Sequence, residues 1–281
     1  MSTPLFTLQN LTCAYRQPNG MAGNPVLKIA ELQIPKGKII VLLGKSGAGK
    51  STILETLGLM NNTLSNNSQL LFMPNENEKY HFETIWEKKN IDEIRKKHFS
   101  FIFQNTNLMP NFTVYENICL TQMIQGSSKA DAMQKAQKMM RQIGLQEIDE
   151  YKKPHELSGG QRQRVAFVRA ITPNFTVLFG DEPTGNLDEI NSRELMNILS
   201  RNVREHQRTA VIVTHNIDLA LEFADQIIIL TKNNESNCGQ IDLNNVFYKE
   251  QNNVTAESNW SAYKQPTDKN QMRTIIEKLI S

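Results

Sequence analysis

The 281-residue sequence contains few cysteines and little net charge. Cys13, Cys119 and Cys238 are odd in number and far apart, and none belongs to a Cys-x-x-Cys pair. This argues against a disulfide framework and against a zinc site. The 31 basic and 29 acidic residues leave a net charge of +2, whereas a dedicated nucleic-acid-binding protein is expected to carry a strongly basic surface. Composition therefore fits a reducing compartment and indicates no nucleic-acid partner.

Long apolar segments are also missing. No apolar run approaches the ~20 residues that a transmembrane helix needs, and the segment "MSTPLFTLQNLT" lacks the basic-then-apolar pattern of a secretory signal. We therefore expect a chain that is neither exported nor membrane-spanning by itself. Its 39% apolar content is sufficient for a sizeable core.

The apolar residues that are present form short strands. Residues 5–15 and 26–34 alternate apolar and polar positions around Asn19-Gly20, the turn signal of a hairpin. Patterns of strands buried on both faces follow at residues 38–43, 99–103, 175–181, 209–215 and 226–232. Helical-length segments separate most of them, so the sequence predicts an α/β fold with a largely parallel sheet.

The best helical pattern lies at residues 128–145. Its apolar residues recur at helical spacing and stop at Gly144, which predicts a C-cap there. They are Ala132, Met133, Ala136, Met139, Met140 and Ile143. We interpret this methionine stripe as core packing, with a partner-binding surface as the alternative.

Two segments rich in Asn, Glu and Ser, residues 61–79 and 233–262, are predicted to be poorly ordered or inserted. At the end of the sequence, Met272, Ile275, Ile276 and Leu279 fall on one face of a short helix. We expect this helix to dock on its own domain and not on a membrane, because its apolar face is small.

A glycine-rich loop follows the strand predicted at residues 38–43. The segment "GKSGAGKST" has the spacing G-x-x-x-x-G-K-[ST] before an apolar-periodic helix, and it comprises Gly44, Lys45, Ser46, Gly47, Ala48, Gly49, Lys50, Ser51 and Thr52. Glycines allow backbone N–H groups to surround phosphates. Lys50 would reach the β- and γ-phosphates of ATP, and Ser51 would hold Mg²⁺. The alternative is a turn that merely links strand to helix.

An acidic pair ends a later buried strand. Asp181 would hold the magnesium through water, and Glu182 would orient or deprotonate the attacking water. The two carboxylates could instead cap a helix. Together with the loop, the pair fits nucleotide kinases, GTPases and DNA-remodelling ATPases as well.

A second glycine turn, "LSGGQ", distinguishes these possibilities. Ser158, Gly159 and Gly160 begin a predicted helix and form a second anion site that has no lysine. The first loop already engages one face of its nucleotide. We therefore interpret this turn as binding the γ-phosphate of ATP held by another subunit, so that two copies complete one catalytic site.

The order of these segments strongly resembles the ATP-binding cassette (ABC) ATPases. The matching elements are "GKSGAGKS", "FIFQ", "LSGGQRQR", "VLFGDEPT", "GNLD" and "VTHN", and the resemblance covers residues 5–231. It implies a P-loop NTPase fold with a mainly parallel core, an antiparallel β subdomain and a helical subdomain at about 105–165. The ATPase domain would then span 1–231, followed by a polar extension, 232–281, with a short terminal helix.

The resemblance also implies roles for further residues. Tyr15 would stack on adenine, although a tyrosine at a strand end can be structural. Gln104 would contact Mg²⁺ or the water, and Asp188 would communicate across the dimer. Ser158, Gly159, Gly160 and Gln161 would bind the partner's nucleotide. His215 follows a strand directly, so its ring should emerge where ligands bind in open α/β sheets; the alternative is a structural strand-end histidine. The implied catalytic set is Glu182, His215 and Gln104.

Within the family, "LMPNFTVYENI" and "DEPTGNLD" resemble the lipoprotein-release, macrolide-export and cell-division subgroup. This implies an ATP- and Mg²⁺-dependent ATPase that forms an ATP-sandwiched homodimer and drives a separate integral-membrane permease. It would be cytoplasmic and peripheral on the inner face of the membrane. One alternative is a cell-division-type ATPase that transmits force or regulates a membrane complex without transport. Another is an ABC ATPase acting on DNA or ribosomes, but the sequence has none of the coiled coils, zinc modules or second cassette of that class.

Two features depart from the family pattern. Gly180 stands where a larger apolar residue is usual, so we expect weaker strand packing beside Asp181. The asparagine-rich segment before Gln104 is longer than usual, so the resemblance does not predict the details of the β subdomain there.

Overall fold

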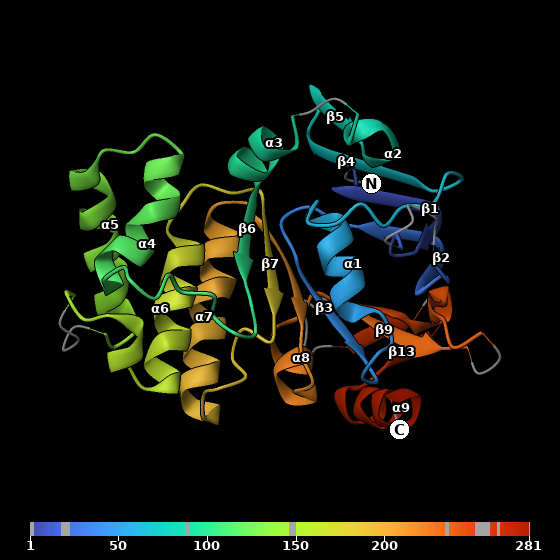
Figure 1. Cartoon of the computed structure of the whole chain (residues 1–281). Helices are drawn as coiled ribbons and strands as arrows, with labels where there is room; N and C mark the ends of the chain where they lie inside the picture. The colour runs from blue at the N-terminus through green and yellow to red at the C-terminus, as the bar shows by residue number, and fades with distance from the viewer. Residues whose placement is uncertain are drawn as a thin grey trace.

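The computed structural model describes residues 3–17, 23–87, 90–145, 150–233, 236–250, 259–262 and 265–280. The predicted Asn19-Gly20 turn lies outside these residues. Within them, hydrogen-bonded strands follow one path in the order β5-β4-β1-β2-β10-β9-β3-β8-β7-β6. Figure 1 shows an elongated molecule with a block of helices at one end and the antiparallel strands at the other.

The parallel core confirms the predicted α/β fold. Its strands are β3 (Ile39–Gly44), β6 (Phe99–Ile102), β7 (Val177–Asp181), β8 (Thr209–Val213) and β9 (Gln226–Lys232). All neighbouring pairs among them run parallel. In β3, Val41 packs into one hydrophobic cluster, whereas Ile40 and Leu42 pack into the cluster on the opposite face. Burial on both faces explains why these strands have continuous apolar sequences.

The antiparallel β subdomain flanks this core. It contains β1 (Phe6–Cys13), β2 (Leu27–Ile34), β4 (Gln69–Asn75) and β5 (Glu78–His81). The short helices α2 (Phe82–Ile85) and α3 (Ile91–His98) follow. The prediction that residues 61–79 are poorly ordered or inserted is wrong, because β4 lies entirely within them and β5 begins there. Polar turns on both sides make the short apolar alternation of β4 hard to recognise in the sequence. Phe72 on β4 pairs with Phe6 on β1, and the centres of their stacked rings lie 4.7 Å apart.

The helical block lies beyond β6 and β7. It consists of α4 (Val114–Ile124), α5 (Lys129–Gln142), a single 3-10 turn (Pro154–Glu156) and α6 (Gly159–Ile171). In α5, the buried stripe that includes Ala132, Ala136 and Met140 joins the core, which confirms the packing interpretation. Gly144 has φ 65° just after α5, as a C-cap glycine should.

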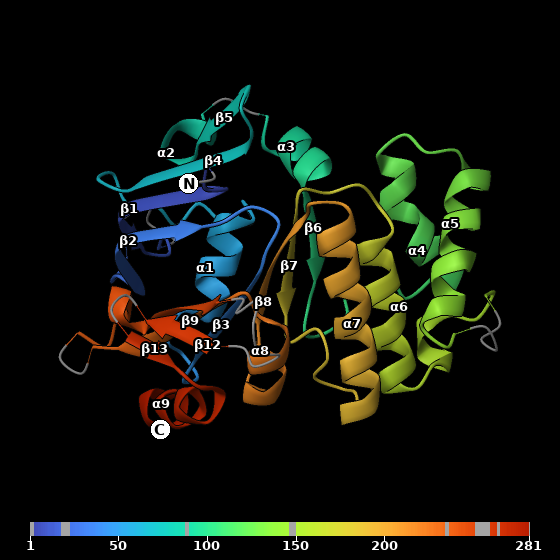
Figure 2. The ribbon, with the colours of Figure 1, turned by 180° about the vertical axis from the view of Figure 1, so that it is seen from behind.

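Three further helices follow core strands. They are α1 (Lys50–Leu57) after β3, α7 (Glu189–Glu205) after β7 and α8 (Ile217–Phe223) after β8. Figures 1 and 2 both place α1 on one side of β6 and β7 and the α4–α6 block on the other. This separation determines which site residues can meet within one chain.

The segment after residue 232 is ordered where it is described. Its elements are β10 (Gly239–Ile241), a 3-10 turn (Leu243–Asn245), β11 (Val246–Glu250), β12 (Asn259–Ala262), β13 (Gln265–Thr267) and α9 (Lys269–Ile280). The prediction that residues 233–262 are poorly ordered or inserted is therefore wrong for their described part: β10 inserts between β2 and β9, and β11 pairs with β9. As predicted, the terminal helix docks on its own chain and buries Met272 and Ile276.

The expected weak packing at Gly180 is not observed. A methyl group added to Gly180 would lie 2.7 Å from Cδ1 of Ile212 and 3.4 Å from Cγ of Pro183. These two side chains fill the space that a larger residue would need. Among the helices of the described ranges, none is both long enough and apolar enough for a membrane span.

Candidate functional site

The glycine-rich loop between β3 and α1 encloses the amine of its own lysine. Nζ of Lys50 donates hydrogen bonds to the carbonyl oxygens of Gly44 (2.7 Å) and Lys45 (2.9 Å). Gly47 and Gly49 have φ 70° and 91°, values that favour glycine. Gly49 is also the N-cap of α1 and supplies no capping side chain, so the first N–H groups of the helix remain available to an anion.

Burial lowers the pKa of Lys50, and the neighbouring carboxylates of Glu182 and Asp181 partly offset this effect. The lysine therefore lies in a desolvated position beside two acidic groups. A desolvated cation that is ringed by carbonyl oxygens interacts strongly with an entering phosphate.

Ser51 and Asp181 meet although they are 130 residues apart. The Ser51 hydroxyl donates a hydrogen bond of 3.1 Å to Oδ2 of Asp181. A hydroxyl and a carboxylate are the hard oxygen ligands that Mg²⁺ prefers, with phosphates and water completing its octahedron. Within the described residues, no group of three or more His, Cys, Asp or Glu side chains forms a protein-only metal site. The donor set thus fits a metal held jointly with a phosphate ligand.

Glu182 has a strained backbone and a buried carboxyl group. Its φ of 48° lies in the left-handed region, which costs about 1–3 kcal/mol and is typical of functional sites. Its Oε2 accepts a hydrogen bond of 3.3 Å from Thr214. Its Oε1 is buried without a hydrogen-bond partner among the described residues, and Nε2 of His215 lies 3.5 Å from it. Burial raises the pKa of Glu182, and the Asp181 carboxylate adds to the effect. These features suit a general base.

The His215 ring follows β8 and is largely exposed. Its pKa is lowered by burial and by the charge of Lys50, which favours the neutral ring near neutral pH. The side chain emerges at the carboxyl ends of the parallel strands, as expected, next to Glu182. The structure therefore brings together Lys50, Ser51, Asp181, Glu182 and His215.

The second glycine turn begins α6. Ser158 Oγ accepts from the Gln161 N–H (3.2 Å), and Gln161 Oε1 accepts from the Ser158 N–H (2.9 Å). This capping box uses both side chains locally and leaves the N–H groups of Gly159 and Gly160 outside it. A methyl group added to Gly159 would meet no atom within 4 Å. Since α6 and α1 lie on opposite sides of β6 and β7 (Figure 1), the turn is not next to its own phosphate loop.

The remaining predicted residues lie around these two sites. The Tyr15 hydroxyl donates to Oε2 of Glu55 (2.9 Å) and is 3.2 Å from Oγ1 of Thr52, so it lies against α1. Gln104 is exposed in the loop after β6. Asp188 caps α7 by accepting a hydrogen bond of 2.9 Å from the Asn191 N–H. Its hydrogen bonds with Asn191 lower the pKa of Asp188. In the described structure, no hydrogen bond joins Gln104 or Asp188 to the residues that gather around Lys50.

Sequence reasoning missed two residues that hold Glu182. Thr214 donates to its carboxylate. Gln163 is fully buried on α6, and its Nε2 donates to the carbonyl oxygens of Pro183 (2.7 Å) and Glu182 (3.4 Å). Gln163 therefore connects the helix of the second glycine turn to the turn that bears Glu182. Its position one helical turn after the two glycines was the available signal.

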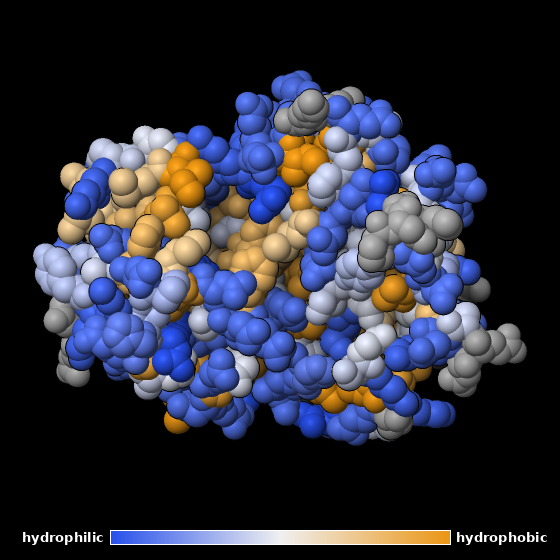
Figure 3. Space-filling model, viewed as in Figure 1, coloured by the Kyte–Doolittle hydropathy of each residue, from blue (hydrophilic) through white to orange (hydrophobic). Residues whose placement is uncertain are grey.

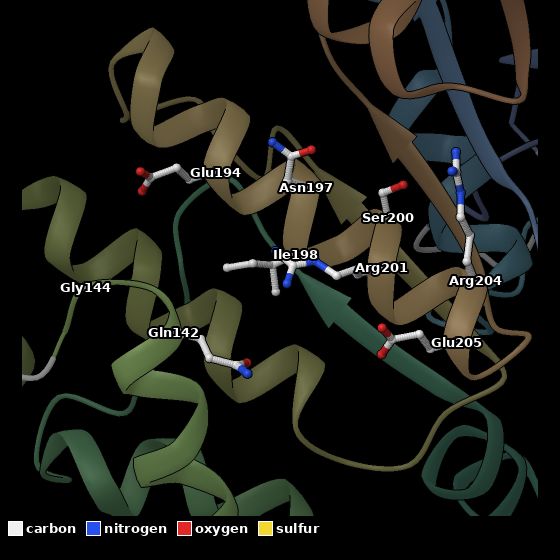
Figure 4. A pocket seen from close by; sticks show the side chains of 9 residues that line it. All are labelled: Gln142, Gly144, Glu194, Asn197, Ile198, Ser200, Arg201, Arg204 and Glu205. Atoms are coloured by element: carbon white, nitrogen blue, oxygen red, sulfur yellow. The ribbon is translucent and has the colours of Figure 1, made fainter.

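A cavity of about 620 Å³ lies elsewhere, between the end of α5 and α7. Figure 4 shows the side chains of Ile198 and Arg201 extending from α7 toward Gln142. None of the predicted nucleotide, metal or catalytic residues lines this cavity. Its volume is therefore unrelated to the chemistry that the motifs predict.

Comparison with known proteins decides the family. The family model described as ABC transporter matches residues 27–185. The chain belongs to the ABC transporter family. The predicted resemblance is thereby confirmed.

Relatives of this ABC cassette include proteins named LolD and MacB. The chain is 33% identical to the lipoprotein-releasing system ATP-binding protein LolD of Rickettsia bellii, over 78% of this chain and 92% of that protein. It is 36% identical to LolD of Paramagnetospirillum magneticum, over 80% of this chain and 94% of that protein. The macrolide export ATP-binding/permease protein MacB of Pasteurella multocida is 32% identical over 82% of this chain but only 33% of MacB.

Solved structures agree with the fold. A dimeric structure of a bacterial ABC transporter cassette matches with a TM-score of 0.70 and 30% identity, covering 80% of this chain and 93% of that one. The same cassette in a dimeric post-hydrolysis state bound to ADP and Pi matches with a TM-score of 0.68, at 30% identity and the same coverage. The ABC-type P-loop NTPase fold predicted from the motifs is confirmed.

Proposed function

We propose that this chain is the ATP-hydrolysing subunit of a membrane ABC transporter complex, which dimerises on ATP and drives a separate permease of the lipoprotein-release or macrolide-export type. The names of two relatives support this proposal. The chain spans nearly all of LolD, which is named as the ATP-binding protein of a lipoprotein-releasing system, and about a third of MacB, which is named as a macrolide export ATP-binding/permease protein. The proposed location is peripheral, on the inner face of the cell membrane.

One observation carries the proposal: the two phosphate-binding turns of one chain lie apart. Lys50, Ser51, Asp181, Glu182 and His215 gather beside α1, whereas the turn that begins α6 lies beyond β6 and β7. Two copies related by a two-fold axis would each place this turn against the other's triphosphate, and the solved structures of the similar cassette are dimeric.

Each side chain then has a definite task. Lys50 and the loop N–H groups would bind the phosphates, and Ser51 with Asp181 would hold Mg²⁺, which neutralises charge on the phosphates. Glu182 would accept the proton of the attacking water, while the Thr214 hydroxyl keeps its carboxylate oriented. Tyr15 would contact the base.

The neighbouring residues complete the assignment. Gln104 would contact the metal or water, and His215 the γ-phosphate. Ser158, Gly159, Gly160, Gln161 and Asp188 would act across the dimer. Residues 1–231 would form the ATPase domain, and residues 232–281 its C-terminal extension.

The membrane partner would bind the Gln104 loop and the part of the helical block that lies within residues 105–156. Large apolar side chains are exposed in this segment, including Met109, Phe112, Met123 and Ile124. Figure 3 shows apolar surface over the helical block and in the hollow beside it. Loss of the γ-phosphate would weaken the dimer interface directly, and this change would move the block against the permease.

Substitution of Gly159 tests the shared site. Since a Cβ added to Gly159 meets nothing within 4 Å in the monomer, Gly159→Asp should fold and bind ATP, yet its carboxylate should repel the partner's γ-phosphate. We expect ATPase activity to fall about 100-fold or more. Lys129→Asp places the same charge at the first position of α5 and is the matched control.

Mixing two inactive variants sharpens the test. Lys50→Met damages the phosphate loop of its own copy, and Gly159→Asp damages the glycine turn that its copy offers to the partner. In a mixed dimer, the intact loop of the Gly159→Asp copy faces the intact turn of the Lys50→Met copy, so one of the two sites is complete. Random pairing should restore about a quarter of wild-type activity. Full activity of Gly159→Asp alone would contradict a site completed by a second copy.

A further inference from the structure

The segment after residue 232 reaches the phosphate loop. Strand β10 lies between β2 and β9, where Gly239 pairs with Leu27 on one side and Lys232 on the other. The Gly239 N–H donates a hydrogen bond of 2.8 Å to the carbonyl oxygen of Val26. In the strand order of the described residues, β10 is the link between the antiparallel subdomain and the parallel core.

Gly239 has no space for a side chain. A methyl group at this position would lie 2.1 Å from the carbonyl oxygen of Ala48 and 2.9 Å from its carbonyl carbon. Because both are backbone atoms, no rotation of a side chain relieves the clash, and either β10 or the loop must move. Ala48 is itself fully buried, and its N–H donates to the carbonyl oxygen of Lys45. Its peptide is therefore fixed between the loop and β10.

Two glycines of the loop also lie against neighbouring strands. A methyl group added to Gly44 would lie 2.5 Å from the carbonyl oxygen of Leu230, and one added to Gly49 would make ordinary contact, at 3.4 Å, with Cδ1 of Leu27. The loop thus lies on the ends of β9, β10 and β2. Only β10 comes entirely from the segment after residue 232.

We propose that Gly239 is a positioning residue for nucleotide binding: through its contact with Ala48, strand β10 holds the loop N–H groups in the conformation that receives a triphosphate. The inference rests on the proposed ATPase function and deepens it. It makes the start of the 232–281 extension a working part of the nucleotide site.

Gly239→Ala tests the contact. Gln240→Ala is the control, because Gln240 lies in the same strand with an exposed side chain. The measurements are titrations of ATP and of inorganic tripolyphosphate, together with the midpoint of thermal unfolding, Tm, without nucleotide. We expect Gly239→Ala to weaken both ligands by the same factor, about 10-fold or more. KM for ATP should rise with the dissociation constant, and kcat at saturating ATP should change less.

Two results would overturn the inference. One is unchanged affinity of Gly239→Ala for both ligands. The other is a loss for ATP alone, since that would place the effect at the base and not at the phosphates. If the wild-type protein itself bound no nucleotide, that result would contradict both the proposed function and the inference that rests on it.

Hydrogen exchange on the wild-type protein gives a second measurement that does not depend on a variant folding. ATP should slow amide exchange at Gly239 and Gln240 together with exchange in the phosphate loop. Slower exchange in the loop with no change in β10 would also contradict the proposed contact.

Discussion

The hydroxyl of Thr214 donates a hydrogen bond of 3.3 Å to Oε2 of Glu182 and accepts one of 3.1 Å from the N–H of Asn216. Asn216 is the N-cap of α8. The threonine therefore connects the buried carboxylate to the start of a helix. Its hydrogen bond lowers the pKa of Glu182 against the larger effect of burial, which raises it.

Thr214→Val should remove this hydrogen bond with little change in shape. The pKa of Glu182 should then rise further, because burial is less opposed. Since a general base must be deprotonated, the acidic limb of the pH–activity profile should move to higher pH, and kcat at neutral pH should fall about 3- to 10-fold. The measurement is steady-state ATPase activity across pH at saturating ATP. Thr214→Ser keeps the hydroxyl and should restore the wild-type profile; an unshifted profile for the valine variant would argue against Glu182 as the base.

Lys50→Met should abolish nucleotide binding and preserve the fold. The buried amine is held by two loop carbonyl groups, and methionine keeps its apolar length without the charge. Affinity for ATP should fall about 100-fold or more, because the lost interaction is a desolvated, charge-assisted one. Fluorescent-nucleotide titration measures this, with Lys36→Met as the control outside the loop. Normal ATP affinity in Lys50→Met would exclude the assigned role.

Glu182→Gln should change stability in a pH-dependent way. The pKa of Glu182 is raised in the folded protein, so folding favours its protonated form. Its contribution to stability is then complete at low pH and is lost as the pH rises through the folded pKa. The glutamine variant, which is neutral at all pH values, should unfold at a higher Tm than wild type at pH 8, with a smaller difference at pH 5.

Calorimetry at both pH values measures this difference, and Glu205→Gln, at an exposed position on α7, provides the comparison. A Tm difference for Glu182→Gln that grows toward acidic pH would reverse the predicted sign.

Met272→Ala tests the docking of α9. Met272 is fully buried in the main hydrophobic cluster, and its truncation should lower the free energy of unfolding by about 2–4 kcal/mol. Urea unfolding measures the loss, and Gln271→Ala changes the exposed neighbour. Equal stabilities of the two variants would mean that α9 does not pack as described.

Much of the core could be predicted because its signals are local. The loop that ends at Lys50 needs a fixed spacing of glycines, and the strand before it is apolar throughout since both its faces are buried. The stripe on α5 required only helical periodicity. Residues 61–79 were misinterpreted because Leu70 and Phe72 alternate over too short a run to stand out among asparagines, and only pairing with β1 makes them a strand.

The sequence by itself determined which residues can bind phosphate: two glycine turns, one with a lysine and one without, and an acidic pair at a strand end. The tertiary structure decided which of them meet. Ser51 reaches Asp181 across 130 residues, Thr214 and Gln163 hold Glu182, and Gly239 lies against Ala48. Such contacts depend on the order of strands in the sheet. Strand order arises from packing between distant segments, and this packing produces no periodic pattern in the sequence.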